Sequence, residues 1–113
     1  MRLTLVETAP QVVKLVLEGR LDAAGVNRLE LPFTAAASAG DRHVLVDFTR
    51  VGFCASLGLR MLIANARVVQ RRGRQMVLFG ACPAVAEVFE TVALTTLLPI
   101  TATEAEALAQ FGA

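Results

Sequence analysis

Few side chains in this chain have both the type and the setting to take part in chemistry, and one of them is the hydroxyl of Ser56. Ser56 falls where an apolar run ending at Phe48 is followed by a helical pattern that stops at Gly73. The first N–H groups of a helix are unpaired and the helix dipole is positive there, so a negative charge on this hydroxyl would be stabilised. We interpret Ser56 as a residue modified by another protein rather than as a catalytic nucleophile.

The other candidate residues are two cysteines and two aspartates. Cys54 and Cys82 each follow an expected strand and are interpreted as small buried hydrophobic residues. Because there is no CxxC pair and only one histidine, a metal site or a cysteine–histidine nucleophile has little support. Asp22 is expected to cap a turn and Asp47 to hold the loop after its strand, rather than to act as paired acid and base. We therefore expect no enzyme activity, no metal and no cofactor.

The spacing of apolar residues predicts the elements that position these side chains. Period-two patterns indicate strands, patterns with a period near 3.6 indicate helices, and Gly or Pro marks their ends. The expected strands are Arg2–Glu7, Val12–Glu18, His43–Phe48, Gln75–Gly80 and Leu97–Ile100. The expected helices are Ala24–Ala39 (with a kink or break at Pro32), Ser56–Arg72, Pro83–Ala93 and Thr103–Phe111. This order predicts one α/β domain over residues 1–113, with a mixed sheet of four to five strands and about four helices.

The composition excludes several classes of protein. Hydrophobic residues make up 55% of the 113 residues and charged residues 19%, which is typical of a folded domain. The formal net charge of +1 and the absence of Trp and Tyr argue against a nucleic-acid partner. No apolar run reaches the roughly 18 residues of a spanning helix, and the N-terminus lacks a signal-peptide pattern. We expect a cytoplasmic protein that does not insert into membranes.

The helix expected at Ser56–Arg72 has two apolar faces. One runs from Leu59 to Val69 and is sufficient to pack on a sheet. The opposite face consists of Leu57, Met61, Ala64 and Val68. Along one flank of this second face lie Arg60, Arg67 and Arg71. Either the Ala24–Ala39 helix covers the second face, or it is exposed as a docking surface rimmed by arginines.

Several segments together resemble the signature of STAS domains, the bacterial anti-sigma factor antagonist family. They are Gly19-Arg20-Leu21-Asp22, Val44 to Thr49, Val51, Phe53, Ser56 and Gly58-Leu59, followed by Pro83-Ala84-Val85 and Val88-Phe89-Glu90. Their order and spacing resemble the family pattern over nearly the whole chain. The resemblance implies the STAS fold and a regulator of transcription that binds a protein partner.

In that family, a serine at the position of Ser56 is phosphorylated by an anti-sigma factor with serine kinase activity, and phosphorylation blocks binding. The resemblance therefore implies such a kinase as the partner and Ser56 as the phosphorylation site. The surface expected to bind the partner comprises Asp22, Asp47, Ser56, Leu57, Arg60, Met61, Ala64 and Val68. Self-association as a homodimer is left open.

This sequence departs from the family pattern on both sides of the serine. The aspartate that usually precedes it is Ala55, and the hydroxyl residue that usually follows it is Leu57. A glycine that is usual near the end of the third helix is Ala93. The first two departures favour a second hypothesis, a non-phosphorylated STAS accessory subunit of a lipid-transport ABC complex or of a signalling scaffold.

Overall fold

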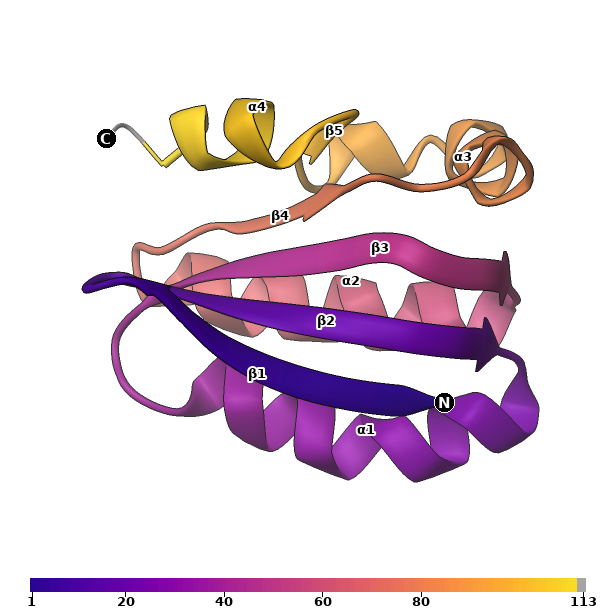
Figure 1. Cartoon of the computed structure of the whole chain (residues 1–113), viewed down its shortest axis with the longest axis horizontal. Coiled ribbons are helices and arrows are strands. Elements are labelled where there is room, and N and C mark those ends of the chain that lie inside the picture. The colour runs from indigo at the N-terminus through magenta and orange to yellow at the C-terminus, as the bar shows by residue number, and fades with distance from the viewer. Residues whose placement is uncertain (112–113) are drawn as a thin grey trace.

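Five strands form one mixed sheet in the computed structural model of the chain, which describes residues 1–111 (Figure 1). The strands are β1 (Arg2–Ala9), β2 (Val12–Leu21), β3 (His43–Cys54), β4 (Met76–Phe79) and β5 (Ile100–Thr101). The helices are α1 (Ala23–Ser38), α2 (Ser56–Arg71), α3 (Pro83–Thr91) and α4 (Glu104–Ala109), with a 3-10 turn η1 (Leu94–Thr96). The predicted α/β class and the predicted order of elements are confirmed. The last two residues of the expected 1–113 domain lie outside the described residues.

The strands follow one another across the sheet in the order β1-β2-β3-β4-β5. β1 and β2 form an antiparallel hairpin, as expected from the apolar alternation on either side of Pro10. The remaining neighbours pair in parallel, each joined through a helical crossover. The carboxyl ends of β2 and β3 therefore meet at one end of the sheet, where α1 and α2 begin.

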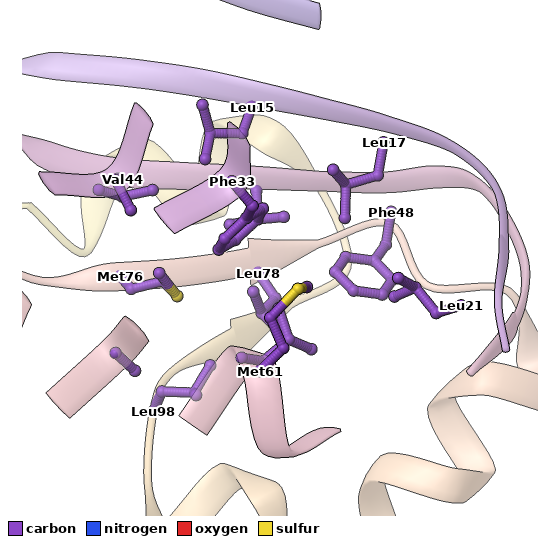
Figure 2. Packing of buried hydrophobic residues seen from close by; sticks show 14 of the residues in the cluster. Leu15, Leu17, Leu21, Phe33, Val44, Phe48, Met61, Met76, Leu78 and Leu98 are labelled. Carbon is purple, nitrogen blue, oxygen red and sulfur yellow. The ribbon is translucent and has the colours of Figure 1, made fainter. Parts of the chain in front are cut away.

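Two apolar clusters lie on the two faces of the sheet. The larger cluster packs α1, α2 and α3 against one face, and the smaller packs α4 against the other face, over β3 and β4. The side chains of Val44, Leu45 and Val46 are 0% exposed because β3 is covered from both sides. Figure 2 shows part of the larger cluster, with Phe48 among its labelled side chains. The ring of Phe48 meets that of Phe89 edge to face, with 5.4 Å between the ring centroids.

Strand β3 is longer than the sequence pattern indicates, because it continues past Phe48 to Cys54. β2 is also longer than expected and ends at Leu21, which pairs with Cys54. Over this extension the backbones of β2 and β3 pair with each other, and bulges shift the register between Val16 and Glu18 and between Gly19 and Arg20. The extra pairing comes from the neighbouring strand and leaves no periodic signal in either sequence.

Two proline positions also differ from expectation. The predicted break at Pro32 does not occur, and α1 runs unbroken through it. Pro32 cannot donate to the carbonyl of Arg28, but both residues are exposed, so water can satisfy that carbonyl. The expected strand Leu97–Ile100 is wrong in its bounds, since η1 precedes and β5 covers only Ile100–Thr101. Pro99 has no N–H for a ladder, although its carbonyl accepts from the N–H of Leu78 at 3.1 Å.

Helix ends follow the capping chemistry that the sequence predicts. Gly73, with φ of 75°, takes the left-handed position after α2. Thr103 begins α4 with a capping box completed by Glu106. His43, the first residue of β3, accepts a hydrogen bond from the N–H of Gln75 at 3.0 Å, and its ring stacks on the ring of Phe111.

Candidate partner-binding surface

Ser56 lies at the junction between β3 and α2, as the first residue of the helix. The preceding residue, Ala55, is held on both sides: its N–H donates to the carbonyl of Leu21 at 2.9 Å and its carbonyl accepts from the N–H of Leu59 at 3.2 Å. Ser56 itself is exposed, and its hydroxyl has no hydrogen-bond partner within residues 1–111. A fixed backbone therefore presents a free hydroxyl.

The start of α2 has no side-chain cap, because the N-cap position is occupied by Ala55. An aspartate there would accept a hydrogen bond from an N–H of the first turn. Without it, these N–H groups and the positive end of the helix dipole are available to a negative charge carried by Ser56. The expected electrostatic setting of Ser56 is therefore present, and it is less occupied than in a chain with the family aspartate.

The first turn of α2 packs tightly against the ends of β2 and β3. A Cβ at Gly58 would lie 3.1 Å from both the sulfur of Cys54 and the Cβ of Leu21, which is closer than such contacts usually come. Burial raises the pKa of the Cys54 thiol to about 11, so this thiol is protonated near neutral pH. Cys54 and Cys82 are both free. Cys54 thus acts as a packing residue under the junction.

The second apolar face of α2 is covered in part by α1, which packs directly on α2. Met61 is 1% exposed and belongs to the larger core cluster, where Figure 2 shows it among the buried side chains. Asn65, one turn on, is also buried and donates from Nδ2 to the carbonyl of Met61 at 2.9 Å. The expectation that Met61 contributes to an exposed docking surface is therefore wrong, whereas Leu57 and Ala64 are exposed and Val68 is half-buried.

The uncovered face of α2 is centred on its arginines. Arg60 and Arg67 are exposed and border an open groove of about 380 Å³ that runs along the helix toward the end of α3. The groove is lined by Ser56, Leu59, Arg60, Ile63, Ala64, Arg67 and Val92. The side-chain amide of Gln70 donates to the carbonyl of Leu97 at 3.0 Å, which holds the segment after α3 against α2. We call this feature the α2 groove.

Several residues of the α2 groove are absent from the predicted surface. Ile63 and Val92 fit the apolar periods of their helices, but Ile63 is only half-buried and Val92 is 46% exposed. The sequence does contain a pattern that indicates which face of α2 is exposed to solvent. The three arginines of α2 fall within a narrow arc of the helix, and an arc of that kind marks the centre of the solvent-facing side rather than its rim.

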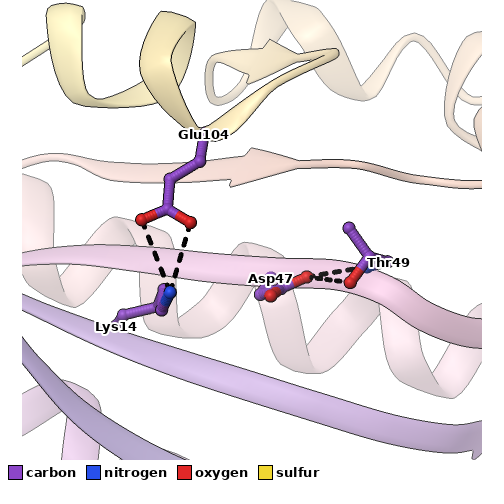
Figure 3. A network of polar contacts seen from close by, with 4 residues as sticks. All are labelled: Lys14, Asp47, Thr49 and Glu104. Atoms are coloured by element: carbon purple, nitrogen blue, oxygen red, sulfur yellow. Dashed lines mark hydrogen bonds and ion pairs between the residues drawn. The ribbon is translucent and has the colours of Figure 1, made fainter.

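The two predicted aspartates lie at different places from the α2 groove. Asp22 caps α1, accepting from the N–H of Gly25 at 2.8 Å, and this hydrogen bond holds the pKa of Asp22 below its usual value. Asp47 accepts from the N–H and hydroxyl of Thr49 at 2.8 and 2.7 Å (Figure 3). Its neighbours Val46 and Phe48 point into the larger cluster, so Asp47 faces the opposite side of the sheet. Asp47 therefore does not lie beside the α2 surface as expected.

An exposed contact between an arginine and an aromatic ring lies near the carboxyl ends of β2 and β3, close to the start of α2. The guanidinium of Arg20 lies 4.4 Å from the centre of the Phe53 ring, and Arg20 also approaches Asp22 at 3.6 Å. Phe53 and Leu57 are 38% and 39% exposed, so apolar surface continues from α2 onto the end of β3. Neither Arg20 nor Phe53 was among the predicted partner-binding residues.

The described residues limit what else the surface can do. Within residues 1–111, no group of three or more His, Cys, Asp or Glu side chains is arranged to hold a metal ion. In the same part of the chain, none of the helices combines the length and the apolar character that crossing a bilayer requires. The features of this surface that a partner can contact are a free hydroxyl, two guanidinium groups and an apolar groove.

Known proteins resemble the chain over almost its whole length. A family described as "Mlab, STAS domain" matches residues 4–99. A Bordetella bronchiseptica protein named "Putative anti-sigma factor antagonist BtrV" is 30% identical over 95 residues, covering 84% of this chain and 82% of BtrV.

Solved structures show the same fold. A STAS domain protein from Planctomyces limnophilus superposes with a TM-score of 0.86 at 20% identity, covering 98% of both chains. The Bacillus antagonist SpoIIAA matches in its unphosphorylated form (TM-score 0.78, 24% identity, 96% and 95% covered) and in its phosphorylated form (0.71, 23%, 96% and 98%). With the sheet order, the β3–α2 junction and the family match in agreement, the chain belongs to the STAS domain family, as an anti-sigma factor antagonist-like member.

Proposed function

We propose that this protein binds an anti-sigma factor with serine kinase activity through the uncovered face of α2, and that the partner phosphorylates Ser56. The observation that carries the proposal is the free, exposed hydroxyl of Ser56 at the start of the α2 groove. Its support comes from the likeness to BtrV and to SpoIIAA, which has been solved with and without phosphate. The protein acts in this proposal as a binding regulator and not as an enzyme.

Electrostatics give the proposed switch its direction. A phosphoserine carries a charge of about −1.5 to −2 near neutral pH. At Ser56 this charge meets the open N-terminus of α2, and Arg60 follows one helical turn later. The phosphate is thus tolerated by the fold. A partner that docks on the groove would have to desolvate this charge, so its affinity falls on phosphorylation.

The sequence simplifies the test, because Ser38 and Ser56 are the only serines of the chain. The protein is incubated with ATP and the candidate anti-sigma factor kinase, and the modified residue is identified by mass spectrometry. We expect one phosphate on wild type and on Ser38→Ala, and none on Ser56→Ala. Partner affinity, measured by calorimetry, should fall in Ser56→Glu and stay unchanged in Ser38→Glu. Absence of phosphate on Ser56 together with full binding by Ser56→Glu would contradict the switch.

A second candidate function is a STAS accessory subunit of a lipid-transport ABC complex that is never phosphorylated. Two observations favour it: Ala55 and Leu57 replace the residues that usually flank the acceptor serine, and the matching family carries the description Mlab. In this case the protein co-purifies with a transport ATPase, and Ser56→Ala supports complex assembly as well as wild type does. Recovery of a kinase-type anti-sigma factor without any ATPase would speak against it.

A further inference from the structure

The α2 groove combines an apolar floor with two arginines along one rim, and this combination restricts what can occupy it. We propose that the partner element seated in the groove is an amphipathic helix whose apolar stripe is flanked by carboxylates two turns apart. The inference rests on the proposed partner-binding role of α2 and names the chemistry of the segment that is bound.

The floor of the groove suits a helix. Leu59, Ile63, Ala64 and Val92 supply apolar surface in an open trough rather than a closed cavity. From Ser56 to Arg67 the trough extends for about 16 Å at 1.5 Å per residue, which equals roughly three turns of a helix lying alongside. Helices that dock in this way place residues spaced three and four apart into an apolar groove.

The rim supplies unpaired positive charge. Four other arginines of the chain lie within 4 Å of a carboxylate; they are Arg20, Arg42, Arg50 and Arg74. Arg60 and Arg67 take part in no ion pair within residues 1–111, and the described lining residues of the groove include no carboxylate. Charge complementarity therefore calls for an acidic occupant rather than a basic or purely apolar one.

The spacing of the two arginines fixes the spacing of the acids. Arg60 and Arg67 are seven residues apart in the sequence, so they point to the same side of α2 about 10 Å apart along the axis. A partner helix that runs alongside presents carboxylates at the same interval when they are also seven residues apart. Each guanidinium can then bind one carboxylate through two hydrogen bonds.

The position of Ser56 links this occupant to regulation. Ser56 lines the same groove as both arginines, at its β3 end. Phosphate on Ser56 adds negative charge to a surface that accepts carboxylates, and it competes with the partner's acids for Arg60. An acidic helix is therefore repelled by phosphorylation, whereas a basic helix would be attracted.

The test uses designed helical peptides of about 14 residues, a length of four turns. One carries Glu at two positions seven apart beside an apolar stripe, and a second carries Lys at those positions. Peptide binding to the whole protein is followed by amide chemical shifts at roughly 50 and 300 mM salt. We expect the Glu peptide to shift the amides along residues 56–67, with affinity reduced about tenfold by Arg60→Glu or Arg67→Glu and reduced by added salt.

Arg28→Glu is the matched control, because Arg28 is an exposed helical arginine of α1 that does not line the α2 groove. It should leave binding of the Glu peptide within about twofold. Three results would overturn the proposal: equal binding of the Glu and Lys peptides, equal loss in Arg28→Glu and Arg67→Glu, or a groove already filled by a second copy of the chain. A missing phosphate on Ser56 with intact peptide selectivity would count against the kinase switch alone.

Discussion

The two sides of α2 use similar residues for different purposes. On the side that faces α1 and the sheet, Met61 and Leu62 are 1% and 0% exposed and Asn65 satisfies its amide within the helix. On the other side, Ile63 is half-buried and Ala64 is exposed, and both line the open groove that Arg60 and Arg67 border. Apolar character alone does not distinguish the sides, since both carry aliphatic residues. The neighbours do: α1 covers one side and leaves the other open.

The first prediction tests the covered side and has the largest expected effect. Met61→Ala should lower the free energy of unfolding by about 2–5 kcal/mol, because it removes a side chain packed in the core and leaves a cavity. Leu57→Ala is the matched control on the same predicted strip, and its cost should stay below about 1 kcal/mol because Leu57 is 39% exposed. Urea unfolding measures both changes. Equal small losses would mean that α1 does not cover Met61.

The sequence was enough to predict the order of the elements around α2. It was not enough to predict which side of α2 the neighbouring helix covers. Period, capping residues and glycine positions predicted the order of elements, the caps at Asp22 and Thr103, and the stop at Gly73. These features depend on residues close together in the chain. The coverage of Met61 by α1 depends on how two helices pack on one sheet face, which periodicity cannot report.

The misplaced residues share this cause. Asp47 is expected near Ser56 when the strand ends at Phe48, but β3 continues to Cys54 and alternation along it sends Asp47 to the opposite face. Val92 continues the apolar period of α3, yet it follows the last helical residue, Thr91, and remains exposed. In both cases the position of the residue in the fold differs from the position that the local sequence pattern predicts.

The second prediction concerns the start of α2, where a substitution should increase the stability of the fold. Ala55→Asp should raise the free energy of unfolding by about 1 kcal/mol, because the new carboxylate can accept from an N–H of the uncapped first turn. The control Ala64→Asn places a side chain of the same shape in the exposed middle of the helix, where no N–H is free and no ion pair with Arg60 or Arg67 can form, and should lower stability by a few tenths of a kcal/mol. Thermal unfolding at neutral pH measures both. No gain at position 55 would show that the first turn already has partners.

The third prediction concerns the residue that follows Val92 at the edge of the α2 groove. Ala93, which follows α3, has φ of 53° and is the only non-glycine residue with positive φ within residues 1–111. Ala93→Gly should stabilise the fold by about 0.5–1 kcal/mol, because glycine adopts this conformation without steric cost. Ala84→Gly, in the exposed first turn of α3, should destabilise it by about 0.5–1 kcal/mol. Calorimetric melting temperatures compare the two, and a loss at position 93 would contradict the strain.

The fourth prediction has the smallest expected effect on folding. The double variant Arg60→Ala/Arg67→Ala should change the free energy of unfolding by less than about 0.5 kcal/mol, because neither side chain is packed or paired. The same variant should slow association with an acidic partner at low salt, as measured by stopped-flow mixing. Arg42→Ala is the contrasting case, since Arg42 binds both oxygens of Glu7 at 2.8 Å and should cost more stability. A double variant that unfolds more easily than Arg42→Ala would break the separation between the two sides of α2.

The strands occupy the sheet in the order in which they occur in the chain. During synthesis, each new strand therefore pairs with one that already exists, and no later segment has to insert between two earlier ones. The face that carries Leu45, Val77 and Phe79 stays open until α4 arrives, because α4 packs over it and is synthesised after all the strands. The emerging chain thus acquires its α2 side early, and it keeps this apolar surface exposed until α4 has left the ribosome.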